Sequence, residues 1–234
     1  MALLTLAIRE IRVETPRTRR LQVSLAGTAF DFRAGQAVWV GRRGDPLRKP
    51  YSIACSPEQA RQEDALELLI QVGADAGEGT HLDPLAEGML VDVDGPTGDF
   101  CFPDDAREPR VLLVAGGTGI APLRAMLWHA LRVLPDREFA LFYSARSADE
   151  FAYGDEMREL ARAGRLALVE TVTREVGAHW AGARGRLTRA RIASMLVPES
   201  TLCCVCGPPA FVQDVTLWLR EIGVGKGRIL AEGW

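Results

Sequence analysis

The chain has 234 residues, of which 47% are hydrophobic and 25% are charged, and its formal net charge is −3. These proportions are typical of a globular protein that buries a core without disulfides or a structural metal. The balance of 28 basic and 31 acidic residues argues against a nucleic-acid-binding protein. No run approaches the ~18 apolar residues that span a bilayer, and the first apolar run lacks the basic start of a secretory signal. We therefore expect a cytoplasmic protein with neither a nucleic-acid nor a membrane partner.

The cysteines and histidines show no metal-binding spacing. Five cysteines form an odd set without a regular framework, which is typical of a protein from a reducing compartment. Cys203, Cys204 and Cys206 lie in an apolar run without a C-x-x-C pair, and the three histidines are scattered. We predict that these cysteines belong to a buried strand and that the protein holds no metal.

The first hundred residues contain short apolar or alternating runs separated by Gly, Pro, Asp and Arg clusters. This spacing predicts a small antiparallel β-barrel of about six strands. A weaker helical pattern is present around residues 82–86. The predicted strands are residues 3–13, 21–25, 36–40, 51–54, 66–72 and 90–93.

A polar segment between two prolines, residues 103–109, separates the two halves of the chain. Such a segment is typical of a domain boundary. We expect a barrel domain over residues 1–104 and an α/β domain over residues 110–234.

Strands and helices alternate after this boundary. Residues 111–115 form a continuous apolar run, as expected of a strand buried on both faces. The following helix places Leu123, Met126, Leu127 and Leu131 on one face, at helical spacing. This alternation predicts a parallel, doubly wound α/β sheet. Further strands are predicted at residues 140–144, 166–170, 202–206 and 228–231, with helices at about 155–162 and 211–222.

A glycine-rich loop, GGTGIAP at residues 116–122, joins the first of these strands to its helix. Glycines let backbone amides approach a pyrophosphate, and the helix N-terminus adds partial positive charge. We therefore expect Gly117, Thr118 and Gly119 to bind nucleotide phosphates; a plain strand–helix turn is the alternative. A nucleoside-triphosphate loop is disfavoured because no Gly-Lys-Ser/Thr follows. Pro122 fits the first helical position, where its missing N–H is not needed.

The ends of the next two strands carry arginine rather than a carboxylate. Arg146 follows the second strand, with no acidic residue before Asp149, and Thr173 and Arg174 follow the third. NAD sites usually place a carboxylate at this point, whereas the 2′-phosphate of NADP needs arginine. The sequence therefore favours NADP(H) over NAD(H).

A series of short motifs follows one order along the chain. They are KPYS at 49–52, GEGT at 77–80, GPTGDF at 95–100, the glycine-rich loop, CGPP at 206–209 and EGW at 232–234. With these motifs the chain resembles the ferredoxin–NADP reductase family over essentially its whole length, particularly the bacterial ferredoxin and flavodoxin reductases.

The resemblance implies FAD on the barrel and a nicotinamide nucleotide on the α/β domain, meeting in the cleft between them. It places Tyr51 against the isoalloxazine ring and Ser52 near flavin N5. It also places Cys206 and Glu232 beside the nicotinamide, and Trp234 over the other flavin face. Further implied FAD-binding residues are Lys49, Pro50, Ile70, Val72, Gly79 and Thr80, and further nucleotide-binding residues are Arg146, Thr173, Arg174, Arg186, Gly207 and Pro208.

Lys49 departs from the family pattern, which has an arginine at this position. A lysine is a point charge and cannot form the planar bidentate fork that arginine forms on a phosphate. We therefore expect weaker flavin binding than is usual in the family, unless the neighbouring Arg48 compensates.

The implied activity is hydride transfer from NAD(P)H to bound FAD, followed by electron transfer to a separate acceptor. The acceptor is separate because the sequence has no cysteine set for an iron–sulfur cluster. A ferredoxin, a flavodoxin or an oxygenase component would fill this role. Residues 1–50 contain ten basic and four acidic residues, so a basic face there would steer a small acidic carrier, unless its arginines are merely solvated. The arginines concerned are Arg17, Arg19, Arg20, Arg42 and Arg43.

Two alternatives remain open. In the first, the protein is a flavin reductase that releases reduced flavin, and the lysine at position 49 favours this alternative. In the second, the protein is an electron-transfer subunit that is inactive outside a larger complex. Subunits of the second kind often carry cluster cysteines, which this sequence lacks.

Overall fold

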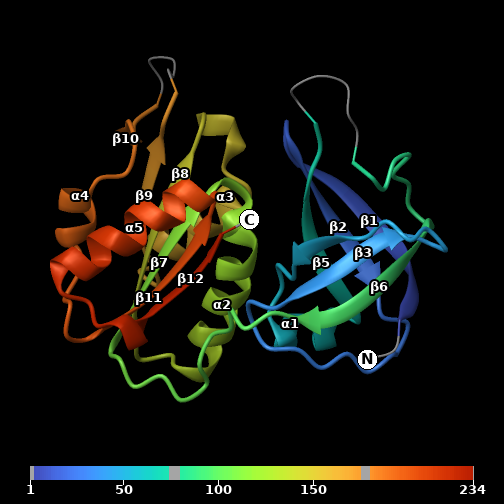
Figure 1. Cartoon of the computed structure of the whole chain (residues 1–234), viewed down its shortest axis with the longest axis horizontal. Coiled ribbons are helices and arrows are strands. Elements are labelled where there is room, and N and C mark those ends of the chain that lie inside the picture. Colours follow the sequence, from blue (N-terminus) through green and yellow to red (C-terminus); the bar gives the residue numbers. More distant parts are fainter. Residues whose placement is uncertain (1–2, 74–79, 175–179, 234) are drawn as a thin grey trace.

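The computed structural model describes residues 3–73, 80–174 and 180–233, which form two six-stranded sheets (Figure 1). The first sheet is antiparallel, in the order β4-β3-β6-β1-β2-β5. Its strands are β1 (Leu4–Thr15), β2 (Thr18–Ser24), β3 (Ala37–Arg42), β4 (Lys49–Ser52), β5 (Ala65–Gln71) and β6 (Leu90–Thr97). The predicted antiparallel strands of the first half are thereby confirmed.

The first sheet closes on itself as a barrel. An isolated bridge between Ile53, just after β4, and Leu68 of β5 joins the two ends of the strand order. Inward-facing residues alternate along the strands, as a period of two requires. Val38 and Val40 of β3 and Leu21 of β2 are almost completely buried and fill the interior.

A short helix, α1 (Pro57–Glu63), lies between β4 and β5, whereas residues 82–86 form turns and no helix; the predicted helix there is wrong. The start of α1 carries a local signal that the prediction missed. The side chain of Ser56 accepts from the backbone N–H of Gln59, and the side chain of Gln59 accepts from that of Ser56. Around residues 82–86, Pro84 disfavours helical backbone at the residue before it.

The second sheet is parallel and runs in the order β10-β9-β8-β7-β11-β12. Its strands are β7 (Arg110–Gly116), β8 (Glu138–Ala145), β9 (Ala167–Val172), β10 (Ala183–Arg184), β11 (Thr201–Gly207) and β12 (Ile229–Gly233). Its helices are α2 (Ile120–Val133), α3 (Gly154–Arg162), α4 (Arg189–Ala193) and α5 (Pro209–Ile222), with single turns η1 (Gly117–Gly119), η2 (Ala148–Glu150) and η3 (Lys226–Arg228). The parallel sheet was predicted, whereas β10 and α4 are too short to show a periodicity.

Helices cover both faces of this sheet, as a doubly wound fold requires. Leu123 of α2 and Met157 of α3 pack on one face, and Ile192 of α4 and Leu219 of α5 pack on the other. Helix α2 also touches the barrel, because Phe102, just beyond the barrel strands, belongs to the same apolar cluster. Figure 1 shows α2 lying between the two sheets. This helix therefore belongs to the core of the α/β unit and to the contact between the units.

All five cysteines are buried free thiols. Cys203, Cys204 and Cys206 lie in the buried strand β11, as predicted. Burial raises the pKa of the Cys55 and Cys203 thiols to about 12. Within the described ranges, no three His, Cys, Asp or Glu side chains are arranged for a metal ion, and no helix is long and apolar enough to cross a membrane.

Candidate functional site

A first cavity, of about 320 Å³, lies between the barrel and the α/β unit. The barrel contributes Ala37 from β3 and Pro50, Tyr51 and Ser52 from β4. A proline is tolerated in β4 because this strand pairs only with β3 within the sheet. The other unit contributes Glu232 and the start of α2. The KPYS motif thus places three of its four residues on this cavity.

His81 fixes the ring of Tyr51, a role that no motif in the sequence indicates. The Tyr51 hydroxyl lies 3.3 Å from His81 Nδ1, and the two rings are stacked with their centroids 5.9 Å apart. His81 Nε2 lies 2.7 Å from the carbonyl oxygen of Val40, so Nε2 donates there and Nδ1 accepts from Tyr51. Burial raises the pKa of Tyr51, so its hydroxyl stays protonated.

Strand β5 turns alternate side chains towards the first cavity and towards the barrel interior. Leu69 and Gln71 line the cavity, whereas the Ile70 side chain is fully buried in the barrel. Val72 follows the strand, and its backbone N–H donates to the carbonyl oxygen of Arg17. Because neighbouring residues of a strand face opposite sides, Ile70 reaches the cavity only through its backbone.

Lys49 and Arg48 have different surroundings. Arg48 Nη2 lies 3.7 Å from Asp92 Oδ2, and Asp92 also accepts from the Thr5 hydroxyl and the Gly44 N–H. The Thr5 and Gly44 hydrogen bonds, together with Arg48, lower the pKa of Asp92. Lys49 is exposed. Arg48 is thus already paired, which leaves Lys49 as the exposed cation of the motif.

The glycine-rich loop forms the floor of a second cavity. Gly117 has a φ of +55° with open space above it, while an added Cβ on Gly119 would lie 2.3 Å from the carbonyl oxygen of Cys206. Helix α2 begins at Ile120, so Pro122 is its third residue, and the prediction that it is the first residue is wrong. Because the first four N–H groups of a helix have no intrahelical partner, the proline still breaks no hydrogen bond. The loop can therefore offer its backbone to a phosphate.

The second cavity, of about 250 Å³, lies at the carboxyl ends of β7, β8 and β9. Open α/β sheets bind nucleotides at this edge. Gln71 and Thr118 line both cavities, so the two adjoin. A group bound in one therefore lies beside a group bound in the other.

The barrel contributes residues to the second cavity that the sequence did not predict. Thr15, Arg17 and Thr18, at the turn between β1 and β2, line it together with the α/β unit. Arg17 Nη1 lies 4.0 Å from Glu150 Oε1, which links the two units across the cavity. A turn shows locally that the chain reverses, but not which distant element it will face.

The predicted phosphate ligands lie at the carboxyl ends of three neighbouring strands, β8, β9 and β10. The backbone N–H of Arg174 donates to the carbonyl oxygen of Arg146 at 2.9 Å, and β10 pairs with β9. Arg146 and Thr173 line the second cavity, whereas Arg174 and Arg186 are exposed beside it and are not part of its lining. The fold thus gathers these residues at one corner.

Cys206 and Glu232 are opposite each other in the register of β11 and β12. Glu232 lines the first cavity, and burial raises the pKa of its carboxyl group. The Cys206 side chain is fully buried and lines neither cavity; burial, and secondarily Glu232, raises the pKa of its thiol. Pro208 lines the second cavity, and Gly207 packs closely against the glycine-rich loop.

Part of the predicted site lies outside the described residues, namely Gly79 with the rest of GEGT before Thr80, and Trp234. Thr80 is described, and its hydroxyl accepts from the backbone N–H of Leu82. This bond links residues 80 and 82.

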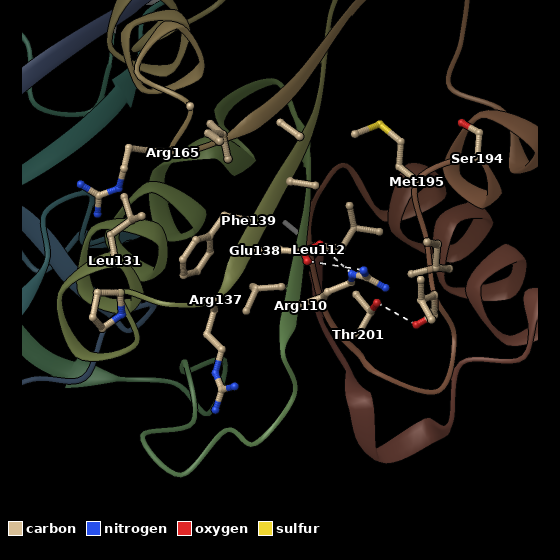
Figure 2. Close-up of a pocket in the computed structure, with 18 residues that line it drawn as sticks. Arg110, Leu112, Leu131, Arg137, Glu138, Phe139, Arg165, Ser194, Met195 and Thr201 are labelled. Atoms are coloured by element: carbon tan, nitrogen blue, oxygen red, sulfur yellow. Dashed lines mark hydrogen bonds and ion pairs between the residues drawn. The ribbon is translucent and has the colours of Figure 1, made fainter.

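A larger cavity, of about 590 Å³, lies at the opposite edge of the parallel sheet (Figure 2). Its lining includes Arg110 and Glu138, the first residues of β7 and β8, which form an ion pair at 2.7 Å. Helices α2 and α3 end near this edge, where Leu131 and Gly164 line the cavity, and helix C-termini carry partial negative charge. This cavity lies at the amino ends of the strands, away from the glycine-rich loop and from the edge at which open α/β sheets bind nucleotides.

The two adjoining cavities fit the groups that the family resemblance implies. The first offers the Tyr51 ring and the Ser52 hydroxyl to a flat heterocycle. The second offers open space above Gly117, the start of α2, and Arg146 to phosphates. The chemistry and the order of the two cavities match a flavin beside a nicotinamide nucleotide.

Two family descriptions cover most of the chain. Residues 5–102 match "Oxidoreductase FAD-binding domain" and residues 113–216 match "Oxidoreductase NAD-binding domain". The chain is 30% identical to oxidoreductase NAD-binding domain-containing protein 1 of Danio rerio, over 100% of this chain and 93% of that protein. It is 32% identical to ferredoxin–NADP reductase B of Sorangium cellulosum, over 75% of this chain and 71% of that protein. It is 31% identical to the reductase subunit of an aromatic O-demethylase of Amycolatopsis, over 90% of this chain and 63% of that subunit.

Solved structures agree with this assignment. A cytochrome P450 reductase of Amycolatopsis superposes with a TM-score of 0.85 at 27% identity, over 99% of this chain and 70% of that one. A ferredoxin NADP+ reductase of Neisseria gonorrhoeae with bound FAD and NADP has the same fold, with a TM-score of 0.83 at 21% identity over 100% and 99% of the chains. The chain therefore belongs to the family of FAD- and NAD-binding oxidoreductases that includes the ferredoxin–NADP reductases.

Proposed function

We propose that the protein transfers hydride from NADPH to bound FAD and passes the electrons to a separate carrier. The observation that carries this proposal is the pair of adjoining cavities, which share Gln71 and Thr118. Hydride transfer requires the reacting atoms to approach within ~3–3.5 Å, and adjoining cavities allow that approach.

The barrel, over residues 1–104, is the FAD domain in this proposal. FAD, when bound, supplies the ring that accepts a hydride and releases electrons. Tyr51 packs on that ring, and Ser52 donates a hydrogen bond near its reactive edge. Lys49, Gly79 and Thr80 hold the phosphates, and the backbone around Ile70 and Val72 lies along the rest of the cofactor.

The α/β unit, over residues 110–234, is the NAD(P) domain. Gly117, Thr118 and Gly119 hold the pyrophosphate at the start of α2. The corner formed by Arg146, Arg174 and Arg186 supports NADPH over NADH, because arginine suits a 2′-phosphate. Glu150 lines the same cavity but lies beside Arg17, which offsets its negative charge. Glu232, Gly207 and Pro208 border the nicotinamide end, with Cys206 buried beside Glu232 in the register of β11 and β12 and with Trp234 over the ring.

Not all of the arginines expected to form a basic docking face for the electron carrier are available for it. Arg17 lines the second cavity, and Arg20 Nε lies 3.6 Å from Glu14 Oε2, so neither contributes to a separate docking face. We place that face around Trp39 of β3, the strand that pairs with β4. Trp39 is 42% exposed and lies opposite Pro50, which lines the first cavity.

Arg42 and Arg43, which are exposed and follow Trp39 along the chain, supply positive charge on this part of the barrel. A small acidic carrier, a ferredoxin or flavodoxin, fits such a face, and an oxygenase component with an acidic surface fits it equally. Relatives named as a ferredoxin–NADP reductase and as an O-demethylase reductase subunit support both kinds of acceptor. Reduction of an acidic carrier should slow steeply as ionic strength rises; a rate independent of salt would remove this docking face.

An anaerobic visible spectrum, followed by separate titrations with NADPH and NADH, tests the proposal. A purified protein with flavin absorbance near ~450 nm that NADPH bleaches more readily than NADH is the expected result. A colourless protein that is active only with added FAD would indicate a flavin reductase, a candidate that the pairing of Arg48 with Asp92 favours. A coloured protein that neither nucleotide bleaches would indicate a subunit that works only in a complex.

A further inference from the structure

Arg124 of α2 is a buried cation that joins the two units. It is 6% exposed, and its Nη1 donates to the carbonyl oxygen of Ala54 at 2.7 Å and to Glu67 Oε1 at 3.0 Å, both in the barrel. Its Nε and Nη2 donate to the two carboxylate oxygens of Glu156 in α3, at 2.8 and 2.9 Å. One guanidinium therefore bridges two carboxylates and a backbone carbonyl from three separate segments. We call these groups the Arg124 cluster.

The Arg124 cluster lies directly behind the first cavity. Its two barrel segments and α2 line that cavity one structural repeat away, which is two residues along the chain in a strand or one turn along the helix, whereas α3, which carries Glu156, does not line it. The pairs, cavity residue first, are Ser52 and Ala54 at the end of β4, Leu69 and Glu67 in β5, and Ala121 and Arg124 in α2. The cluster thus connects the segment that presents Ser52 to the helix that begins at the glycine-rich loop.

Neighbouring groups complete the cluster. The ring of Tyr153 lies against the guanidinium, with 4.4 Å from Arg124 Cζ to the ring centroid, and Trp128 Nε1 donates to Glu156. Burial lowers the pKa of Arg124, but Glu156 and Glu67 outweigh it and raise the pKa, so the guanidinium stays charged. A buried charge that loses its partners is strongly unfavourable, so the contact between the units resists sliding.

We infer that Arg124 is a positioning residue for hydride transfer, which sets the separation between the ring held by the barrel and the nucleotide held at the start of α2. This inference rests on the proposed function. A misplacement of about 1 Å between reacting groups lowers a rate by about 100-fold, so a rigid link behind the cavity acts on the rate and not on the affinity for nucleotide.

The test compares FAD-loaded Arg124→Met with Arg158→Met. Arg158 forms a similar fork with Glu170, at 2.9 and 3.0 Å, but entirely within the α/β unit. For Arg124→Met we expect the rate constant of flavin reduction at saturating NADPH to fall about 10- to 100-fold, with the Kd for NADPH changed less than about threefold. We also expect faster amide hydrogen exchange in residues 52–56 and 120–127. Arg158→Met should leave both the reduction rate and this exchange unchanged.

Two further variants keep the test decisive. Glu67→Gln removes only the charge across the units and should lower the reduction rate less than Arg124→Met, which decides the matter if Arg124→Met does not fold. Arg124→Lys retains one cross-unit contact and should recover part of the rate. Wild-type rates in both folded Arg124→Met and Glu67→Gln, or equal losses in Arg158→Met, would overturn the inference.

The exchange measurement separates this inference from the proposed function. If NAD(P)H does not reduce the wild-type flavin, the proposed function fails, and faster exchange at residues 52–56 and 120–127 in Arg124→Met alone would still support the link between the units. Unchanged exchange in Arg124→Met would overturn the link even if the wild-type protein is an active reductase.

Discussion

The two walls of the cleft are built in different ways. The barrel wall presents side chains, such as Tyr51, Ser52 and Leu69. The α/β wall contributes side chains such as Glu232 as well, but its glycine-rich loop presents backbone and packs so closely on β11 that Gly119 has no room for a Cβ. Substitutions on the barrel wall should therefore have graded effects, whereas a single added methyl group on the α/β wall should have a large one.

Gly119→Ala should have the largest effect. The added Cβ would lie 2.3 Å from a backbone oxygen of Cys206, so the loop must shift; overpacking of this kind lowers the free energy of unfolding by about 1–3 kcal/mol. We expect NADPH binding to weaken in parallel, measured by titration, with FAD binding retained. Gly227→Ala is the control, because nothing lies within 4 Å of its added Cβ. Equal behaviour of the two variants would show that the α/β wall tolerates side chains after all.

Lys49→Ala tests the barrel wall and should have a smaller effect. Because Lys49 is exposed, its contact with a phosphate contributes at most about 1 kcal/mol, so the Kd for FAD should rise up to about fivefold. Fluorescence of released flavin measures it. Lys226→Ala, which changes the other lysine of the chain, should retain FAD fully. An unchanged Kd for FAD in Lys49→Ala would remove Lys49 from the flavin site, and Lys49→Arg should tighten binding.

Removing the corner arginines should change nucleotide preference more than overall rate. For Arg146→Ala and Arg174→Ala we expect the ratio of kcat/KM for NADPH to that for NADH to fall about two- to fivefold each, since exposed charge pairs contribute less than about 1 kcal/mol. Arg137→Ala, on the cavity at the opposite edge of the sheet, is the matched control (Figure 2). An unchanged ratio in both corner variants would argue against a 2′-phosphate at this place.

Glu232 lies where the two walls meet and should give the smallest effect. Burial raises the pKa of the Glu232 carboxyl group in the folded protein. Ionisation of this group therefore lowers the free energy of unfolding as pH rises from the pKa of the unfolded chain through the raised pKa. Glu232→Gln cannot ionise, so its stability should match the wild type below about pH 4 and exceed it at pH 8. Thermal unfolding across this range measures the difference, with the exposed Glu199→Gln as control. A stability gain that persists at low pH would contradict the burial argument.

Local signals explain what the sequence could predict. The apolar run of β7, the glycines after it and the helical spacing of α2 are all contained within about 25 residues, so they could be recognised without knowing the fold. The motif strand β4 was recognisable in the same way, through Tyr51 and Ser52. The capping box at Ser56 and Gln59 was equally local, and α1 was nevertheless missed.

Contacts between distant segments could not be predicted. Arg124 meets Glu67, 57 residues away, and Glu156, 32 residues away, and no periodicity links the three. His81 stacks on Tyr51 across 30 residues for the same reason. Such partners depend on how the barrel and the α/β unit pack together, which is a property of the folded molecule and not of any one segment.

The burial of all five thiols has a practical consequence. A thiolate, not a thiol, reacts with oxidants and with labelling reagents, and burial keeps these cysteines both protonated and out of reach. The native protein should therefore survive the peroxide that a flavin can release in air. Two surface cysteines introduced one on each unit should therefore be the sole labelling points, and a pair of spin labels on them can report the distance between the units without removal of any natural cysteine.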